Sequence, residues 1–271
     1  NLSFIIPVYN RPDEILELLE SFSNLEGDSD FEIVIVEDGS EKRSEHHVNE
    51  FREDLNIAYY QKTNSGPGDS RNYGMKKAKG NYFIILDSDV ILPSDYLIQV
   101  KTALKQSFFD AYGGPDTVHE SFTNIQKAIN FAMTSVITTG GIRGRGKQVG
   151  KFQPRSFNMG LSKEAFLSSG GFGSIHPGED PDLSLRLEQL GFKIGLIENA
   201  YVYHKRRISW AKFFKQVNKF GLVRPILNKW HPKSSTVIYW FPTFFSLSFI
   251  AALLCMLIGI NVFIYLFLIY F

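Results

Sequence analysis

Short apolar runs alternate with helix-like patterns through most of the chain. The runs are rich in Ile, Val and Phe, which predicts buried strands at residues 2–7, 31–36, 57–60, 83–86, 157–161 and 201–204. Apolar residues at helical spacing after Pro12 predict a helix at residues 12–22, residues 66–74 open a second helix, and further helices are expected at 163–169 and 177–187. Strands that alternate with helices predict an α/β domain with a mostly parallel sheet covered on both faces.

Two carboxylates follow directly on one of these strands. Residues 82–86 are Tyr-Phe-Ile-Ile-Leu, and Asp87, Ser88 and Asp89 come next. Right-handed crossovers place the ends of the first, second and fourth strands at one edge of the sheet, so Asp38 should face the same crevice. Neighbouring carboxylates repel each other, and a hard divalent cation that also carries substrate phosphates would relieve the repulsion. The alternative for the tripeptide alone is a strand that ends in an acidic turn.

Four short motifs follow one another in the N-terminal half. They are Ile-Ile-Pro-Val-Tyr-Asn at 5–10, Val-Glu-Asp-Gly-Ser at 36–40, the segment 64–72 that ends in Arg-Asn, and Leu-Asp-Ser-Asp at 86–89. In this order and spacing the set resembles the nucleotide-sugar domain of family 2 glycosyltransferases, which have the Rossmann-like GT-A fold with a mixed, mostly parallel sheet. The resemblance extends from residue 1 to about residue 220.

The resemblance implies a site for a nucleotide diphosphate sugar, with a UDP-sugar as the expected donor. The loop after the first strand and the Glu37-Asp38 turn would hold the base and ribose, and Arg71 would donate hydrogen bonds near the phosphates. The alternative for Arg71 is a solvated helix residue. The implied donor-binding residues are Pro7, Tyr9, Asn10, Arg11, Glu37, Asp38, Asn64, Arg71, Asp87 and Ser88.

The resemblance also implies a metal centre. Mg²⁺ or Mn²⁺ would bind Asp89, with Asp87 facing either the metal or the ribose, and would stabilise charge on the leaving diphosphate. His204 ends a late strand, where the family places a metal-ligating histidine, and imidazole is a common ligand. The alternative for a lone histidine is a structural or surface role.

Three acids, Glu179, Asp180 and Asp182, stand at the front of a predicted helix. Capping and the helix dipole explain one of them, but three exceed what a cap needs. In the family an acidic pair at this place contains the catalytic base, which carries over to Asp180. That residue would take the proton from an acceptor hydroxyl during a displacement that inverts the anomeric configuration. Glu179 and Asp182 would then lie beside the acceptor or the diphosphate.

The segment Gln216–Gly221 resembles the Gln-x-x-Arg-Trp element of membrane-bound polysaccharide synthases, but has Lys219 for Arg and Phe220 for Trp. We therefore expect Gln216 and Lys219 on the acceptor or diphosphate side. The departure argues against a processive synthase and favours addition of one sugar to a lipid-linked or saccharide acceptor in cell-surface polysaccharide synthesis.

Charge is distributed unevenly along the chain. The totals balance at 29 Lys+Arg against 28 Asp+Glu, yet no acidic residue follows Glu198. Apolar residues at helical spacing between 210 and 220 lie beside Lys212, Lys215 and Lys219, which predicts a basic amphipathic helix for an anionic membrane surface. Nucleic acid is the rival partner for a basic patch, and the apolar sequence that follows argues against it.

Residues 239–271 contain no charged side chain, which predicts a transmembrane segment with interfacial Tyr and Trp. Basic residues before it place the catalytic domain on the cytoplasmic side of the cell inner membrane. The single cysteine, Cys255, excludes an intramolecular disulfide. Because the chain begins inside a strand and ends in apolar sequence, we expect it to be part of a longer protein.

The expected organisation is a GT-A catalytic domain at residues 1–205, a basic interface region at 206–235 and a transmembrane segment at 239–271. Its expected partners are a nucleotide diphosphate sugar, a lipid-linked or saccharide acceptor and membrane lipids, and not nucleic acid. Two alternatives stay open, a catalytically inactive nucleotide-sugar-binding scaffold and a processive polysaccharide synthase. The Gly-rich basic loop at 139–150 is either a surface loop or a lid that contacts diphosphate.

Overall fold

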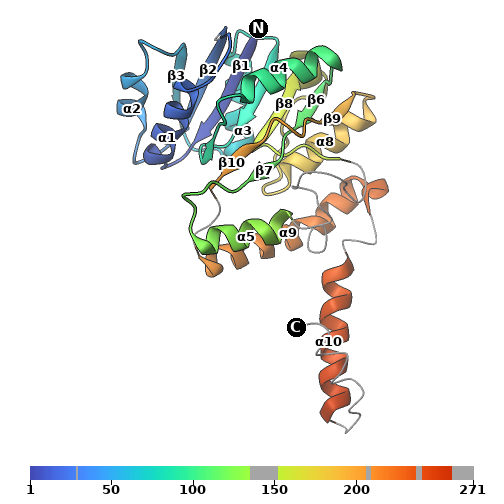
Figure 1. Ribbon diagram of the computed structural model, residues 1–271. Coiled ribbons are helices and arrows are strands. Elements are labelled where there is room, and N and C mark those ends of the chain that lie inside the picture. The colour runs from blue at the N-terminus through green and yellow to red at the C-terminus, as the bar shows by residue number, and fades with distance from the viewer. Residues whose placement is uncertain (29, 135–151, 206–208, 236–239, 258–271) are drawn as a thin grey trace. The chain divides into compact units, whose positions relative to one another are not determined.

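The computed structural model describes residues 1–28, 30–134, 152–205, 209–235 and 240–257 (Figure 1). By internal contacts the chain divides into two units, Asn1–Ile226 and Leu227–Phe271. The strands are β1 Leu2–Val8, β2 Phe31–Asp38, β3 Ile57–Lys62, β4 Tyr82–Leu86, β5 Val90–Ile91, β6 Ala111–Gly113, β7 Asp116–Thr117, β8 Asn158–Ser162, β9 Ile194–Leu196 and β10 Val202–His204. The helices are α1 Pro12–Ser23, α2 Glu45–Glu50, α3 Pro67–Lys77, α4 Tyr96–Gln106, α5 Asn124–Thr134, α7 Lys163–Ser169, α8 Glu179–Gln189, α9 Trp210–Trp230, the 3₁₀ helix η1 Pro232–Ser234 and α10 Phe241–Leu257.

A seven-stranded sheet in the order β3-β2-β1-β4-β8-β6-β9 forms the centre of the first unit. Parallel pairing joins β3, β2, β1 and β4, and also β6 and β9, whereas β8 is antiparallel to both of its neighbours. The prediction of a mixed, mostly parallel sheet is therefore confirmed. The first strand continues past Pro7 to Val8. Its pairing with β4 ends at Ile5, so Pro7, which has no N–H, is tolerated at this position.

Helices cover both faces of the sheet. Successive residues of each strand point to opposite sides, and the apolar side chains on both sides are buried against helices. Phe4 and Ile6 pack in one apolar cluster with buried side chains of α1, α2 and α4. Ile5 lies in a second cluster with side chains of α3, α7 and α8. The parallel strands β1, β2 and β4 thus end at the same edge, where their polar residues follow.

A second sheet of three short strands, in the order β5-β10-β7, lies next to that edge (Figure 1). In it β10 pairs antiparallel with β5 and parallel with β7, so that His204 stands opposite Val90. A backbone hydrogen bond of 2.9 Å from Lys205 N to Asp89 O extends the pairing beyond the strands. This small sheet brings the sequence after residue 200 to the end of β4.

The predicted basic helix is present as α9, and it extends beyond residues 210–220 to Trp230. Gly221 does not adopt the left-handed backbone that ends a helix, so α9 continues through it and contains Pro225. Several of its apolar side chains are exposed, among them Trp210 (57%) and Phe214 (72%).

The prediction of a transmembrane segment at residues 239–271 is not supported by the part of it that the structure describes. Its helix there, α10, has 17 residues, and no helix among the described residues is long and apolar enough to cross a bilayer. Residues 258–271 of the predicted segment, and the loop 139–150, lie outside the described residues.

Candidate active site

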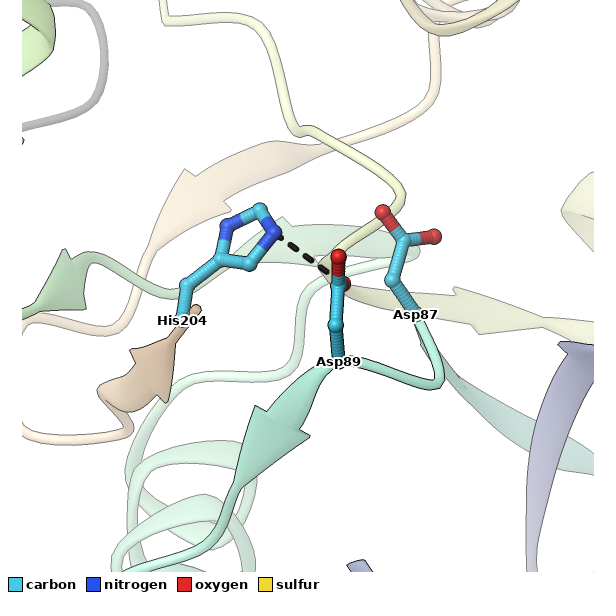
Figure 2. Close-up of side chains that lie close together, drawn as sticks. All are labelled: Asp87, Asp89 and His204. Carbon is cyan, nitrogen blue, oxygen red and sulfur yellow. Dashed lines mark ion pairs between the residues drawn. The ribbon is translucent and has the colours of Figure 1, made fainter. Parts of the chain in front are cut away.

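Asp87, Asp89 and His204 come together at the carboxyl edge of the central sheet (Figure 2). The turn after β4 carries the two acids, and β10 carries the histidine. The Nε2 atom of His204 lies 3.2 Å from Oδ1 of Asp89. One ligand atom from each of the three side chains can be chosen so that all lie within 4.8 Å of one another. The predicted juxtaposition of residues more than 110 positions apart in the chain is therefore present.

The donor set fits a divalent metal ion. Two carboxylates supply the hard oxygen ligands that Mg²⁺ and Mn²⁺ take, and one imidazole nitrogen is compatible with Mn²⁺. The three side chains are partly buried, so solvent and substrate oxygens could complete a coordination shell. Arg11 also reaches this group, with Nη1 2.9 Å from Oδ2 of Asp89, and thereby connects the start of α1 to the acidic turn.

Arg71 links the acidic turn to the front of α8. Its guanidinium lies 2.7 Å from Asp87 and 3.4 Å from Glu179, and it stacks 5.2 Å from the centre of the Phe172 ring. Burial acts to lower the pKa of Arg71, but the charges of Asp87, Asp180 and Glu179 outweigh it and raise the pKa. A fixed, buried cation therefore stands between the candidate donor and acceptor sides.

Asp180 lies in the first turn of α8, and its Oδ2 accepts a 3.1 Å hydrogen bond from the backbone N–H of Ser156. Its Oδ1 is buried and has no hydrogen-bond partner among the described residues. Burial raises the pKa of Asp180 above that of an ordinary aspartate, although the charge of Arg71 opposes the rise. A carboxylate with a raised pKa and an unused oxygen is suited to accept a proton.

Glu179 faces a histidine that the sequence analysis does not identify. The Nδ1 atom of His176 lies 3.0 Å from its carboxylate. This hydrogen bond raises the pKa of His176, whereas the positive charges of Arg71 and Lys219 oppose the rise. Burial acts to raise the pKa of Glu179, but the contacts with His176 and Arg71 lower it.

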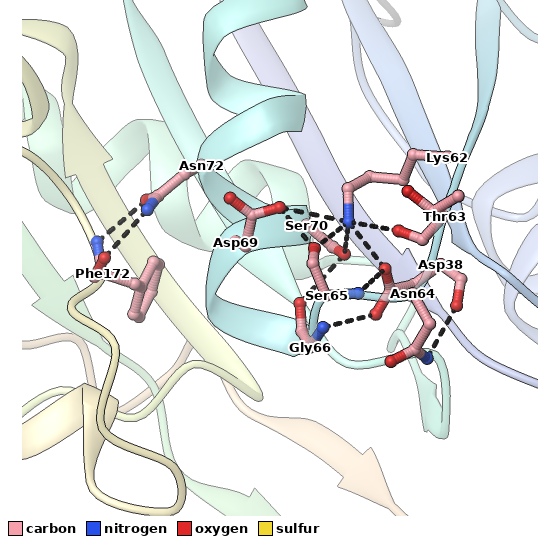
Figure 3. Close-up of polar contacts among 10 residues, drawn as sticks. All are labelled: Asp38, Lys62, Thr63, Asn64, Ser65, Gly66, Asp69, Ser70, Asn72 and Phe172. Carbon is pink, nitrogen blue, oxygen red and sulfur yellow. Dashed lines mark hydrogen bonds and ion pairs between the residues drawn. The ribbon is translucent and has the colours of Figure 1, made fainter.

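Asp38 lies at the end of β2 within a dense polar cluster (Figure 3). Its Oδ1 accepts from Lys62 Nζ at 2.7 Å and from Ser65 N at 2.9 Å, and its Oδ2 accepts from Gly66 N at 2.9 Å. Burial acts to lower the pKa of Lys62, but the hydrogen bonds with Asp38 and Asp69 outweigh it and raise the pKa. Asp38 therefore holds the loop before α3, and contacts with a base or ribose would be additional to these bonds.

Neighbouring residues of the motifs hold the same loops together. Asn10 has φ 54° and accepts from the backbone N–H groups of Glu41 and Lys42 at 2.8 and 3.0 Å, which ties the loop after β1 to the loop after β2. Asn64 donates to Asp38 O at 2.9 Å. Asn72 bonds both backbone groups of Phe172, at 2.8 and 2.9 Å (Figure 3), and so fixes the segment that leads to α8.

The remaining predicted residues occupy different surroundings. Glu37 is buried and accepts from Ser40, Ser44 and Tyr59, which is a loop-supporting role. Further along the chain Asp182 pairs with Arg186 at 2.8 Å. Four of the set differ mainly in exposure: Tyr9 is exposed, Pro7 and Gln216 are half-buried, and Ser88 is buried.

Three side chains at the site escape the sequence analysis. Each is a single residue with no motif around it, and only the fold brings it to the site. Lys62 lies beside Asp38, Asp116 beside His204, and His176 beside Glu179. The single usable signal is that Lys62 comes two residues after the predicted strand 57–60; the structure extends this strand to Lys62 and pairs it with β2, which ends at Asp38.

Comparison with known proteins shows a match to the family model described as glycosyl transferase family 2 over residues 3–168. An uncharacterized glycosyltransferase of Rickettsia felis is 35% identical over 120 residues, which is 44% of this chain and 20% of that protein. Chondroitin synthase of Escherichia coli is 27% identical over 75% of this chain and 34% of its own length. The chain thus spans 20% and 34% of the lengths of these two relatives.

Two solved structures share the fold. Staphylococcus aureus TarS 1-349 in complex with UDP-GlcNAc superposes with a TM-score of 0.59 at 23% identity, covering 77% of this chain and 59% of that one. Mannosyltransferase PcManGT from Pyrobaculum calidifontis in complex with GDP-Man and Mn²⁺ gives 0.61 at 16% identity, covering 81% and 61%. At these identities the likeness establishes the GT-A arrangement of the chain.

Proposed function

The chain belongs to glycosyl transferase family 2, and from this premise we propose that it transfers a sugar from a nucleotide diphosphate sugar to an acceptor hydroxyl with inversion. One observation carries the proposal. Arg71 joins the Asp87-Asp89-His204 group to the front of α8, where Asp180 lies, which supports a candidate metal site and a candidate base at one edge of the sheet.

Each side chain has a distinct task in this proposal. Asp180 accepts the proton of the acceptor hydroxyl through its unpartnered Oδ1. Arg71 fixes Asp87 and Glu179 in place, because a buried guanidinium that bridges two carboxylates has little freedom to move. Asp87, Asp89 and His204 would hold Mg²⁺ or Mn²⁺, which supplies positive charge against the leaving diphosphate.

The expected donor is a UDP-sugar. The TarS structure with UDP-GlcNAc supports a uridine nucleotide, whereas PcManGT with GDP-Man shows that the same fold also holds guanine. For the acceptor we propose a lipid-linked or growing saccharide of a cell-surface polysaccharide, supported by the polymer-forming relative chondroitin synthase. The chain has Lys219 and Phe220 where the Gln-x-x-Arg-Trp element of polysaccharide synthases has Arg and Trp. We therefore favour transfer of a single sugar over processive synthesis.

The rival function is a scaffold that binds the nucleotide sugar without turnover. Release of free nucleotide diphosphate distinguishes the two, and we expect release from at least one UDP-sugar in a panel supplied with lipid-linked saccharides and Mn²⁺. EDTA should abolish the release and excess Mn²⁺ should restore it, because the ion held by Asp87, Asp89 and His204 would offset the charge of the leaving diphosphate. Binding without release would favour the scaffold, and release that survives EDTA would contradict the metal role.

We also propose that α9 rests on the cytoplasmic surface of the inner membrane. Its exposed Trp210 and Phe214 stand beside Lys212, Lys215 and Lys219, and no acidic residue follows Glu198. Exposed aromatics beside lysines match an interface with anionic lipid headgroups.

Replacement of Lys212, Lys215 and Lys219 by Glu should release the full chain from anionic vesicles at low salt. Each basic residue near such a surface contributes on the order of 1 kcal/mol, so the loss should be large in a flotation assay. A matched triple reversal of three exposed lysines elsewhere, Lys42, Lys76 and Lys105, should leave flotation close to that of the wild type. Equal flotation of both variants would show that α9 does not face lipid.

A further inference from the structure

Asp116 stands behind His204 in the three-stranded sheet. Its strand β7 pairs in parallel with β10, with Asp116 opposite Val202, while β5 pairs with the other side of β10. The small sheet therefore brings together three segments, which carry Asp89, His204 and Asp116. None of the motifs in the sequence includes Asp116.

The two ring nitrogens of His204 face different carboxylates. Nε2 lies 3.2 Å from Oδ1 of Asp89, and Nδ1 lies 3.4 Å from Oδ2 of Asp116. Phe157 stacks on the same ring, with centroids 5.0 Å apart and an interplanar angle of 29°. The stacking restricts the plane of the imidazole, so that each ring nitrogen faces one carboxylate.

The surroundings of the two carboxylates differ. The side chain of Asp116 is fully buried, whereas that of Asp89 keeps 14% of its surface exposed. A buried carboxylate needs donors, and an imidazole N–H is one that this fold aims at it. Asp89 instead faces the partly open edge where Asp87 and Arg11 also lie.

From this geometry we infer that Asp116 is a positioning residue that holds His204 as the Nδ1–H tautomer, with the Nε2 lone pair directed at the Asp87-Asp89 group. The inference rests on the metal site proposed above. A carboxylate that accepts the second N–H of a ligating histidine fixes the ring and increases the basicity of the ligating nitrogen. Asp116 would thus act on a metal ion only through His204.

The tautomer can be measured on the wild-type protein without any metal. Long-range ¹⁵N correlation spectra of histidine-labelled protein at about pH 8.5, roughly two units above the ordinary histidine pKa of about 6.5, report which ring nitrogen carries the proton. The signal of His204 is assigned by its loss in a His204→Gln variant. We expect protonated Nδ1 and unprotonated Nε2, and the opposite tautomer would overturn the inference.

The second readout is Mn²⁺ affinity by calorimetry. Asp116→Ala should weaken Mn²⁺ binding by roughly 10–100-fold, the usual effect of removing a partner of a ligating side chain. Asp116→Asn keeps an acceptor oxygen but no charge, so its loss should be smaller. Glu32→Gln is the matched control, since Glu32 is a buried carboxylate that accepts from Ser3 and from Gly80 N outside this site.

The outcomes separate the inference from the proposed function. If wild type binds no Mn²⁺ while His204 is the Nδ1–H tautomer, the proposed metal site fails, whereas the positioning of His204 by Asp116 stands. If wild type binds Mn²⁺ and folded Asp116→Ala binds it equally well, only the role of Asp116 is overturned. Where Asp116→Ala does not fold, Asp116→Asn and the wild-type tautomer decide the question.

Discussion

Asp180→Asn should lower turnover by about 10²–10⁴-fold and leave donor affinity close to that of the wild type. The substitution keeps the size of the side chain and removes its ability to accept a proton, and loss of a general base has this effect. The range corresponds to about 3–5 kcal/mol of transition-state stabilisation. Donor binding should survive, because Asp180 lies at the front of α8 and the predicted metal ligands lie on β10 and in the turn after β4.

The pH dependence of turnover gives a second signature. Burial raises the pKa of Asp180, so the acidic limb of the kcat profile should lie above the ordinary aspartate value of about 3.9. In the Asn variant that limb should disappear from the residual rate.

The substitution Asp180→Asn should lower activity without lowering the stability of the folded protein. Because the folded-state pKa of Asp180 is raised, its ionisation opposes folding, and this cost grows as the pH rises from the unfolded pKa of about 3.9 through the folded value. At neutral pH the cost is present, so Asp180→Asn should not lower the melting temperature. Lost activity in a fully stable protein is the expected combination.

A matched control separates catalysis from helix capping. Glu164 is an exposed acid in the first turn of α7, and Glu164→Gln removes a helix-dipole charge of the same kind outside the site. It should leave turnover unchanged. Near-normal turnover of Asp180→Asn, measured by release of nucleotide diphosphate, would show that Asp180 is only part of a helix N-terminus.

Asp89→Asn should weaken Mn²⁺ binding by at least about 100-fold and abolish metal-dependent turnover. Substitution of groups that only support a ligand typically costs 10–100-fold, and Asp89 offers a ligand oxygen directly. The change also removes the charge that faces Arg11 at 2.9 Å and His204 at 3.2 Å. Calorimetric titration with Mn²⁺ measures the effect.

Asp95→Asn is the corresponding control. Asp95 accepts a 2.9 Å hydrogen bond from Gln99 at the start of α4 and has no part in the proposed site. Its Mn²⁺ affinity should equal that of the wild type. A folded Asp89→Asn protein with wild-type Mn²⁺ affinity would remove Asp89 from the metal site.

Five of the seven strands of the central sheet could be predicted because they are long enough to show their pattern, whereas β6 and β9 have three residues each and escape prediction. β1, β2 and β4 are mostly apolar runs that polar residues end or follow, so the edge that carries Asp38, Asp87 and Asp89 follows from connectivity alone. The strands β5 and β7 have two residues each, too few for any alternation. Asp116 lies on β7, which is why no pattern reveals it.

Local sequence also says little about which hydrogen-bond partners a polar side chain already has in the fold. The motif containing Asp38 predicts a ligand-facing carboxylate, whereas the fold surrounds that carboxylate with Lys62 and two backbone N–H groups. Likewise the three acids at the front of α8 look equivalent in sequence. Only the packing pairs Asp182 with Arg186 and Glu179 with Arg71. It also leaves Oδ1 of Asp180 without a hydrogen-bond partner among the described residues.

Calorimetric titration of UDP into wild type, Asp89→Asn and Asp180→Asn, each with Mn²⁺ and with EDTA, tests most directly whether one sheet edge holds separate donor and acceptor acids. We expect wild type and Asp180→Asn to bind UDP with similar affinity in Mn²⁺ and weakly in EDTA, and Asp89→Asn to bind weakly in both. Equal UDP affinity in Mn²⁺ and in EDTA for the wild type, or weak binding by a folded Asp180→Asn protein in Mn²⁺, would contradict this division.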